Sequence, residues 1–297
     1  MAVRGYTLRA AELAGLLAGL LTSVALLIAG CALVGVAAAG GGGAAVAVVL
    51  AAVLVVVVFA CCDRLALSAM LARPVGEVEH PELYRLVREL SKDARLPVPR
   101  LYLSPADQPN VFAVGRGPRS AAICCTEGLL RVLDEAELRA VLGHELAHVS
   151  GYDVLVSSVA AGLAAAITFP ASLARFTRSG PADPGSGLRG VENLLMLVFG
   201  PVAAVIVRLA VSREREYRAD MAGALLAGDP VALASALRKI DAGTAELALA
   251  PDGRRVAVGH LMIACPFRPE GVARLFLSHP PVGERLRRLE ALAGYRR

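Results

Sequence analysis

The sequence contains no tryptophan, few other aromatic residues and few charged residues. Aromatic residues make up 4% and charged residues 19% of the 297 residues, whereas hydrophobic residues reach 56% and the mean hydropathy is +0.59. Soluble domains contain about 25% charged residues, so the composition favours a membrane protein. The net charge of +5 does not indicate nucleic-acid binding, because the arginines are dispersed and no basic patch is interleaved with aromatic residues.

Cysteine pairs with the CxxC spacing of a metal knuckle or a redox site are also absent from the sequence. Cys31, Cys61 and Cys62 lie within or beside apolar runs, and Cys124 and Cys125 are adjacent in a predicted strand. We therefore expect buried, reduced thiols in a protein that faces the cytosol. A lipoprotein signal with a lipidated Cys31 is the competing interpretation, but the second apolar run follows too soon for an exported soluble domain.

The chain contains long apolar runs without charged residues. Residues 13–36 and 44–62 are separated by four glycines and flanked by arginines at both outer ends. A membrane span needs about 20 apolar residues, so these runs predict a transmembrane hairpin within residues 1–64, with both outer ends in the cytoplasm. Residues 154–173 and 191–211 are the third and fourth predicted spans. The fourth has an uncharged centre of about 14 residues, which fits a buried or re-entrant helix as well as a span.

Two of the five histidines lie four residues apart in the segment His144-Glu-Leu-Ala-His148. Residues at i and i+4 share one face of a helix, so both imidazoles can bind one metal ion. Glu145, about 100° round the helix, can reach a water molecule on that metal. This HExxH spacing is typical of zinc hydrolases. Asp134 and Glu137 form an acidic variant of the capping box before the motif, which predicts the helix that the chemistry needs.

The position of the third metal ligand distinguishes types of zinc enzyme. Val154 stands where an HExxHxxGxxH enzyme has its third histidine, which excludes that type. Glu216 and Asp220 are spaced to share a helix face, so Glu216 could bind zinc while Asp220 accepts the outer N–H of a ligating imidazole. Glu214 is an alternative ligand by position, and a solvated face of Arg and Glu pairs is the alternative to a metal site.

Short strands are expected at residues 100–103, 111–114 and 121–126, and a helix is expected to begin near Pro81. These elements predict a small sheet beside the HExxH helix, and the edge of that sheet would accept an extended peptide by strand addition. The predicted fold class is therefore mainly α with a small β-sheet, in a multi-pass membrane protein.

Five segments occur together in the order of a known family. They are Asn110-Val-Phe-Ala-Val-Gly115, Thr126-Glu-Gly-Leu-Leu130, Gly143-His-Glu-Leu-Ala-His148, Ser212-Arg-Glu-Arg-Glu-Tyr-Arg-Ala-Asp220 and His279-Pro-Pro281 with Arg285. Through them, essentially the whole chain resembles the HtpX-type membrane zinc endopeptidases, relatives of the CAAX prenyl endopeptidases. The chain departs from the family in two of these segments. Asn-Val-Phe-Ala, with Val111, stands for the usual Asn-Ala-Phe-Ala, and Leu277-Ser-His-Pro-Pro stands for the usual Ser-Thr-His-Pro-Pro. These departures affect the expected substrate preference more than the expected activity.

The resemblance implies one zinc ion per chain, held by His144, His148 and Glu216 in a gluzincin-like domain, in which a second helix adds a glutamate to the HExxH helix. Three protein ligands leave the fourth position for a water molecule, whose pKa zinc lowers to about 7. The resemblance implies that Glu145 is the general base, which takes a proton from this water and later passes it to the departing amine.

The resemblance also implies supporting roles around the zinc ligands. Asp220 would orient a ligating imidazole, and Asn110 would help to hold the substrate backbone. A further donor to the oxyanion is expected, for which His279, His260 and Arg285 are candidates. We name His279 among these, although a cap or a packing role beside the Pro-rich turn fits each of the three equally.

The predicted organisation has four parts: a transmembrane hairpin (1–64), a first catalytic part with the HExxH helix (65–152), a second pair of membrane helices (153–211) and a second catalytic part with the third ligand (212–297). His148 precedes the third apolar run and Glu216 follows the fourth. The site should therefore face the cytoplasm close to the plasma (inner) membrane. There the enzyme would cleave membrane-associated or misfolded proteins, in the membrane-protein quality control and stress response that the resemblance implies.

The sequence leaves three alternative functions to compare with this one. A CAAX-type prenyl endopeptidase would need more spans and a larger enclosed chamber than this chain supplies. A catalytically inert membrane scaffold would carry the HExxH helix without a metal. A transporter is disfavoured because the apolar runs contain few ionisable groups of the kind that a transport pathway needs.

Overall fold

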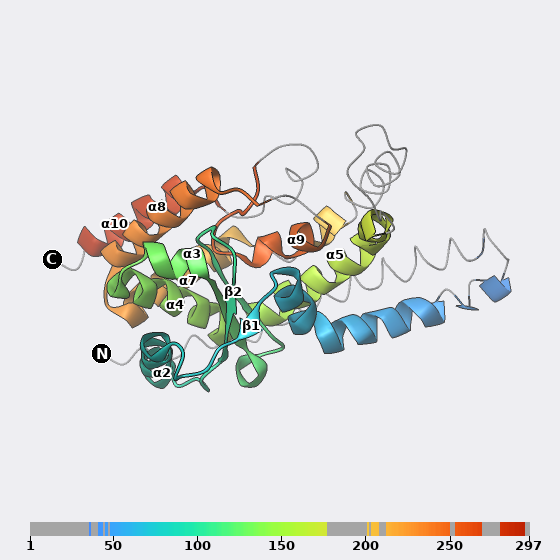
Figure 1. The fold of residues 1–297 in the computed structure, drawn as a ribbon, viewed down its shortest axis with the longest axis horizontal. Helices are drawn as coiled ribbons and strands as arrows, with labels where there is room; N and C mark the ends of the chain where they lie inside the picture. The colour runs from blue at the N-terminus through green and yellow to red at the C-terminus, as the bar shows by residue number, and fades with distance from the viewer. Residues whose placement is uncertain are drawn as a thin grey trace.

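The computed structural model describes residues 36, 41–43, 45–46, 48–176, 201, 203–207, 212–249, 253–268 and 280–294. In this part of the chain, a small sheet and the helices around it form one folded portion. The apolar helix Gly41–Ala69 and helix α5 (Asp153–Phe176) extend from it side by side (Figure 1). The predicted class, mainly helical with a small sheet, is confirmed.

The sheet has four strands in the order β1-β2-β4-β3. Their bounds are Arg73–Pro74 for β1, Arg100–Ser104 for β2, Val111–Val114 for β3 and Ala122–Thr126 for β4. Strands β2 and β4 are parallel, whereas β1 and β3 run antiparallel to their neighbours. The three predicted strands are confirmed; β1 is only two residues long and has no alternating pattern that a sequence could reveal. Strands β3 and β4 are joined through Gly115 and Gly117, whose φ angles of 144° and 146° suit glycine.

Within the described ranges, seven further α-helices surround the sheet or pack beside it. They are α2 (Pro81–Ala94), α3 (Glu127–Val132), α4 (Glu135–Ser150), α7 (Arg213–Ala227), α8 (Pro230–Glu246), α9 (Gly253–Val258) and α10 (Val282–Gly294). The predicted capping box is present at the start of α4, where Asp134 Oδ1 accepts from the Glu137 N–H at 2.9 Å and Glu137 Oε2 accepts from the Asp134 N–H at 3.0 Å. This cap fixes where the HExxH helix begins.

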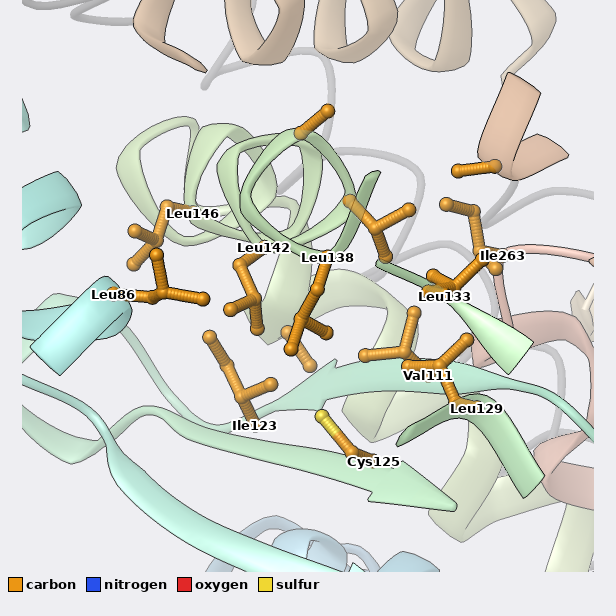
Figure 2. Close-up of a cluster of buried hydrophobic side chains, with 14 of the residues drawn as sticks. Leu86, Val111, Ile123, Cys125, Leu129, Leu133, Leu138, Leu142, Leu146 and Ile263 are labelled. Carbon is orange, nitrogen blue, oxygen red and sulfur yellow. The ribbon is translucent and has the colours of Figure 1, made fainter. Parts of the chain in front are cut away.

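Strands β3 and β4 are buried on both faces of the sheet, which explains why they read as nearly continuous apolar runs. On one face, Ile123 and Cys125 pack with Leu86 of α2 and Leu142 of α4 (Figure 2). On the other face, Phe112, Val114 and Cys124 pack with Ala66, Leu67 and Met70 from the end of helix Gly41–Ala69. That helix therefore continues past the predicted domain boundary at residue 64, because its last turns cover the sheet.

Among the described residues, helix Gly41–Ala69 alone is long and apolar enough to cross a membrane by itself. Helices α4 and α5 pass the same test only as a pair, and they are bent by 85° at their junction. The predicted span at residues 13–36 lies outside the described residues except for Val36, and so does much of the span at residues 191–211. The structure thus supports one predicted span and leaves the multi-pass arrangement as a prediction.

Helix α5 packs closely against helix Gly41–Ala69. A Cβ atom on Gly162 would lie 2.6 Å from Val58 Cγ1, so a larger residue here would require the Val58 side chain to move. Val58, Cys62, Val159 and Leu163 form the buried contact between the two helices. The apolar helices are therefore fixed to each other as well as to the sheet.

Candidate metal centre

Helices α4 and α7 bring three potential metal ligands to one point. His144 Nε2 lies 3.2 Å from His148 Nε2 and 4.0 Å from Glu216 Oε2, and His148 Nε2 lies 3.5 Å from Glu216 Oε1. The three ligand atoms lie within 4.8 Å of one another, in a group with the donor types of a zinc site. Ligand atoms about 2.1 Å from a tetrahedral zinc ion lie about 3.4 Å apart, so this donor set fits zinc. Glu214, the alternative ligand, is exposed to solvent.

Two glycines allow the helices to approach closely enough for this arrangement. A Cβ atom on Gly223 of α7 would lie 2.5 Å from the backbone nitrogen of His144 and 2.6 Å from its Cα atom. A Cβ atom on Gly143 of α4 would lie 2.9 Å from the Gly223 carbonyl oxygen. Backbone atoms cannot move aside as a flexible side chain can, so any larger residue at these positions would separate α4 from α7.

The outer nitrogen of His144 faces Asp220, as the sequence predicted. His144 Nδ1 lies 3.0 Å from Asp220 Oδ1. Arg285 of α10 holds this carboxylate from the other side, donating from Nε to Oδ2 at 2.8 Å and from its Nη2 to Oδ1 at 2.6 Å. Burial disfavours the carboxylate, but Arg285 outweighs burial and lowers the pKa of Asp220 to about 2. Asp220 is therefore an ionised acceptor for the imidazole.

The outer nitrogen of His148 faces a carboxylate that the sequence did not predict. His148 Nδ1 lies 3.2 Å from Asp153 Oδ2, and the other oxygen of Asp153 accepts from Arg215 at 3.1 Å. On one continuous helix, a residue five positions further on would lie about 140° away round the axis. The 85° bend between α4 and α5 brings Asp153 back to His148. Tyr152, with a φ of 58°, occupies the bend in a left-handed conformation that no pattern in the sequence signals.

Glu145 is buried beside the ligands and next to strand β3. Burial raises the pKa of its carboxyl group to about 7, although His148 and the backbone N–H of Ala113 both act to lower it. Burial also disfavours protonation of His148, but Glu216 and Asp153 outweigh it and raise the pKa of this imidazole to about 9. A carboxyl group with a pKa near 7 is suited to proton transfer at neutral pH.

Asn110 is buried at the start of β3 and bonds to backbone groups. Its Nδ2 donates to the Ala264 carbonyl at 3.0 Å, and its Oδ1 accepts from the Val111 N–H at 3.1 Å. These bonds attach the segment around Ala264 to the sheet. The predicted contact of Asn110 with the substrate backbone is not tested by them.

The three candidate oxyanion donors have different positions. His279 lies outside the described residues. His260 is buried, with Nε2 3.2 Å from the Ser157 carbonyl oxygen. Arg285 is fully buried and bonds to Asp220 and, through Nη1, to the Ile263 carbonyl at 2.9 Å. Because a buried guanidinium requires such partners, Arg285 has a supporting position behind Asp220.

The free edge of β3 is partly covered by the chain itself. Phe112 pairs with Met262 in an antiparallel bridge, and the Ile263 N–H donates to the Val111 carbonyl at 3.0 Å. The backbone N–H of Ala113, next along the strand on this edge, faces Glu145. The predicted peptide-binding edge is therefore reduced to the part of β3 that adjoins Glu145.

Comparisons with known proteins agree with this geometry. Residues 77–293 match the model of peptidase family M48. The Protease HtpX homolog of Kineococcus radiotolerans is 56% identical over 239 residues, which are 78% of this chain and 80% of that protein. The homolog of Paenarthrobacter aurescens is 50% identical over 232 residues (78% and 79%), and that of Bifidobacterium longum is 45% identical over 234 residues (78% and 76%). The resemblance predicted from the motifs is confirmed, and the chain belongs to the metallopeptidases of family M48.

Proposed function

We propose that this metallopeptidase is a zinc endopeptidase that hydrolyses membrane-associated or misfolded proteins beside the inner face of the plasma membrane. The observation that carries the proposal is the convergence of His144, His148 and Glu216 next to a buried carboxyl group, that of Glu145. These are the elements of a catalytic zinc site, in which three protein ligands leave one position for water.

In the proposed mechanism, His144, His148 and Glu216 would hold the zinc ion, which would act as a Lewis acid and lower the pKa of a water molecule to about 7. Glu145 removes a proton from the attacking water and delivers it to the departing amine. Asp220 and Asp153 fix the orientation of the two imidazoles from behind.

An extended substrate would lie along the remaining edge of β3. The outward N–H of Ala113 is adjacent to Glu145, so a peptide paired with the strand here would have a backbone carbonyl close to the general base. Main-chain pairing is tolerant of side-chain identity. This tolerance suits an enzyme that acts on many misfolded proteins.

The membrane location rests on the apolar helices that adjoin the site. Helix Gly41–Ala69 covers one face of the sheet, and α5 begins at Asp153 beside His148. The arginines at the end of the apolar run support a cytoplasmic position for the catalytic part. The resemblance to the HtpX-type endopeptidases supports the proposed quality-control role, and this position agrees with it.

Zinc content and casein cleavage, measured on purified protein, test the proposal. Wild type should contain about one zinc per chain. Glu145→Gln should retain zinc and lose cleavage by about 10²-fold or more. Glu216→Gln should lose both, whereas Glu214→Gln, on the same helix but exposed, should keep both. Retention of zinc and activity in Glu216→Gln would exclude the proposed third ligand.

A comparison of two substrates, a prenylated peptide and an unfolded membrane protein, separates this enzyme from a CAAX-type endopeptidase.

A further inference from the structure

The end of the apolar helix marks a sharp boundary between apolar and charged surface. Residues 13–62 contain no charged side chain, and Asp63 and Arg64 end this run. Up to that point the helix presents apolar side chains outward: Val57 is 51% exposed and Phe59 is 43% exposed. A bilayer that contains this helix therefore has its polar boundary near Asp63.

Four exposed arginines gather at this boundary from three parts of the chain. Arg64 belongs to the helix itself. Arg100, at the start of β2, donates to Asp63 at 3.0 Å and to the Ser120 carbonyl at 3.2 Å. Arg116 and Arg119 lie in the turn between β3 and β4. We call these four residues the arginine cluster: Arg64, Arg100, Arg116 and Arg119.

Arg116 reaches furthest toward the apolar part of the helix. Its guanidinium carbon lies 5.9 Å from the centre of the Phe59 ring, which is within the range of a cation–π contact. Phe59 precedes Asp63 by one helical turn, about 6 Å along the axis. This contact places the guanidinium beside the last turn of the apolar surface, in the interfacial region where arginine can reach the lipid head groups.

The protein neutralises only one of the four charges of the cluster. Asp63 is paired with Arg100. In the part of the chain that the structure describes, no carboxylate forms an ion pair with Arg64, Arg116 or Arg119. Three guanidinium groups are therefore available to an external anion.

The turn that carries Arg116 and Arg119 is fixed to the rest of the membrane-facing surface. The Gly115 N–H donates to Ser158 Oγ of α5 at 3.0 Å. The Tyr152 ring packs against Gly117, where an added Cβ atom would lie 2.9 Å from it. Tyr152 is itself 42% exposed, and tyrosine is enriched at membrane interfaces. The cluster is thus a preformed surface on the membrane side of the metal centre.

We propose that the arginine cluster binds the phosphate groups of anionic phospholipids in the leaflet that adjoins the catalytic part. The occupant follows from charge complementarity and from the position of the cluster, beside an exposed apolar helix and at the depth of the head groups. Because Tyr152 and Asp153 connect this surface to His148, lipid binding would also fix the height of the metal centre above the bilayer. This inference rests on the proposed membrane location but not on peptidase activity.

Lipid selectivity tests the proposal directly. The full chain is reconstituted in phosphatidylcholine nanodiscs that contain trace spin-labelled phosphatidylglycerol or spin-labelled phosphatidylcholine, and the motionally restricted fraction of each label is measured. Wild type should prefer phosphatidylglycerol. The triple variant Arg64→Gln, Arg116→Gln and Arg119→Gln should lower this preference about tenfold, because each basic residue near the surface contributes to binding.

Two further measurements separate lipid binding from a general change in charge or folding. A control triple variant, Arg88→Gln, Arg131→Gln and Arg238→Gln, removes the same charge from exposed positions on α2, α3 and α8 and should keep the preference. In wild type, raising the salt concentration should weaken the preference because the phosphate contacts are screened.

Two results would overturn the inference: equal selectivity in wild type and the Arg64, Arg116 and Arg119 variant, or no selectivity in wild type that has inserted into the discs. Failure of wild type to insert would instead contradict the membrane location in the proposed function. Zinc content does not enter this measurement, so a failed peptidase assay leaves the result interpretable.

Discussion

Each histidine of the HExxH motif has its outer nitrogen next to a carboxylate, and each of these carboxylates is paired with an arginine. His144 faces Asp220 and Arg285, and His148 faces Asp153 and Arg215. An ionised acceptor behind an imidazole fixes its tautomer and raises its basicity toward a metal. The two sets differ in origin, because Asp220 lies on the helix of the third ligand whereas Asp153 begins the apolar helix α5.

Replacing Asp153 by asparagine should weaken zinc binding about 10-fold to 100-fold. The variant keeps the shape of the side chain but removes the charge that supports His148 and pairs with Arg215. Competition with a chromophoric chelator measures the affinity independently of activity. Asp63→Asn is the matched control, since Asp63 is also buried and paired with an arginine but lies away from the ligands. Equal zinc affinities in the two variants would contradict the role of Asp153.

Zinc binding at pH 7 should release about one proton from His148. In the metal-free protein the pKa of this imidazole is raised to about 9, so it is protonated at pH 7, whereas zinc binds the neutral form. Titration calorimetry in buffers of different ionisation enthalpy counts the released protons. Asp153→Asn should reduce the release at pH 7 and above, because removing the carboxylate lowers the pKa of His148. An absence of proton release in wild type would show that the imidazole is already neutral.

At the scale of elements, the close contact of α4 and α7 decides whether the third ligand reaches the two histidines. Gly223→Ala should destabilise the protein by about 1–3 kcal/mol and weaken zinc binding, because its Cβ atom would collide with the His144 backbone. Thermal unfolding in detergent and chelator competition measure the two effects. Gly283→Ala on α10, where an added Cβ atom meets nothing within 4 Å, should leave zinc affinity unchanged. If both variants bind zinc as wild type does, the helices do not require this contact.

The elements were predictable where local patterns determine them. The capping box of Asp134 and Glu137, the short apolar run that begins at Val111 and the i and i+4 spacing of Glu216 and Asp220 each predicted a feature that the structure contains. The bend between α4 and α5 was not predictable, because it depends on a left-handed Tyr152 packed against Gly117. The contact of Asp153 with His148, which this bend creates, was missed for the same reason.

Over the whole molecule, contacts between residues far apart in the chain determine features that local sequence patterns do not predict. Arg285 was expected among the possible oxyanion donors, yet it pairs with Asp220, since a buried guanidinium needs a carboxylate. The sheet edge is expected from the sequence to accept an extended peptide, and Met262 covers part of it. Both contacts join residues far apart in the chain, and spacing within a single helix or strand carries no information about them.

Metal removal should reveal how the site joins the two catalytic parts of the chain. His144 and His148 come from α4 and Glu216 from α7, on either side of residues 153–211, so a zinc ion held by all three would link these parts. A ligand that binds only the folded state stabilises it by about 2.7 kcal/mol at a hundredfold excess over its Kd. For a protein of this size about 1 kcal/mol corresponds to 2–4 °C, so a chelator should lower the Tm by about 5–10 °C.

Glu214→Gln should show the same drop in Tm and Glu216→Gln a smaller one, because zinc cannot link the parts without the α7 ligand. A Tm that is independent of chelator in wild type would mean that the two parts are held together without the metal.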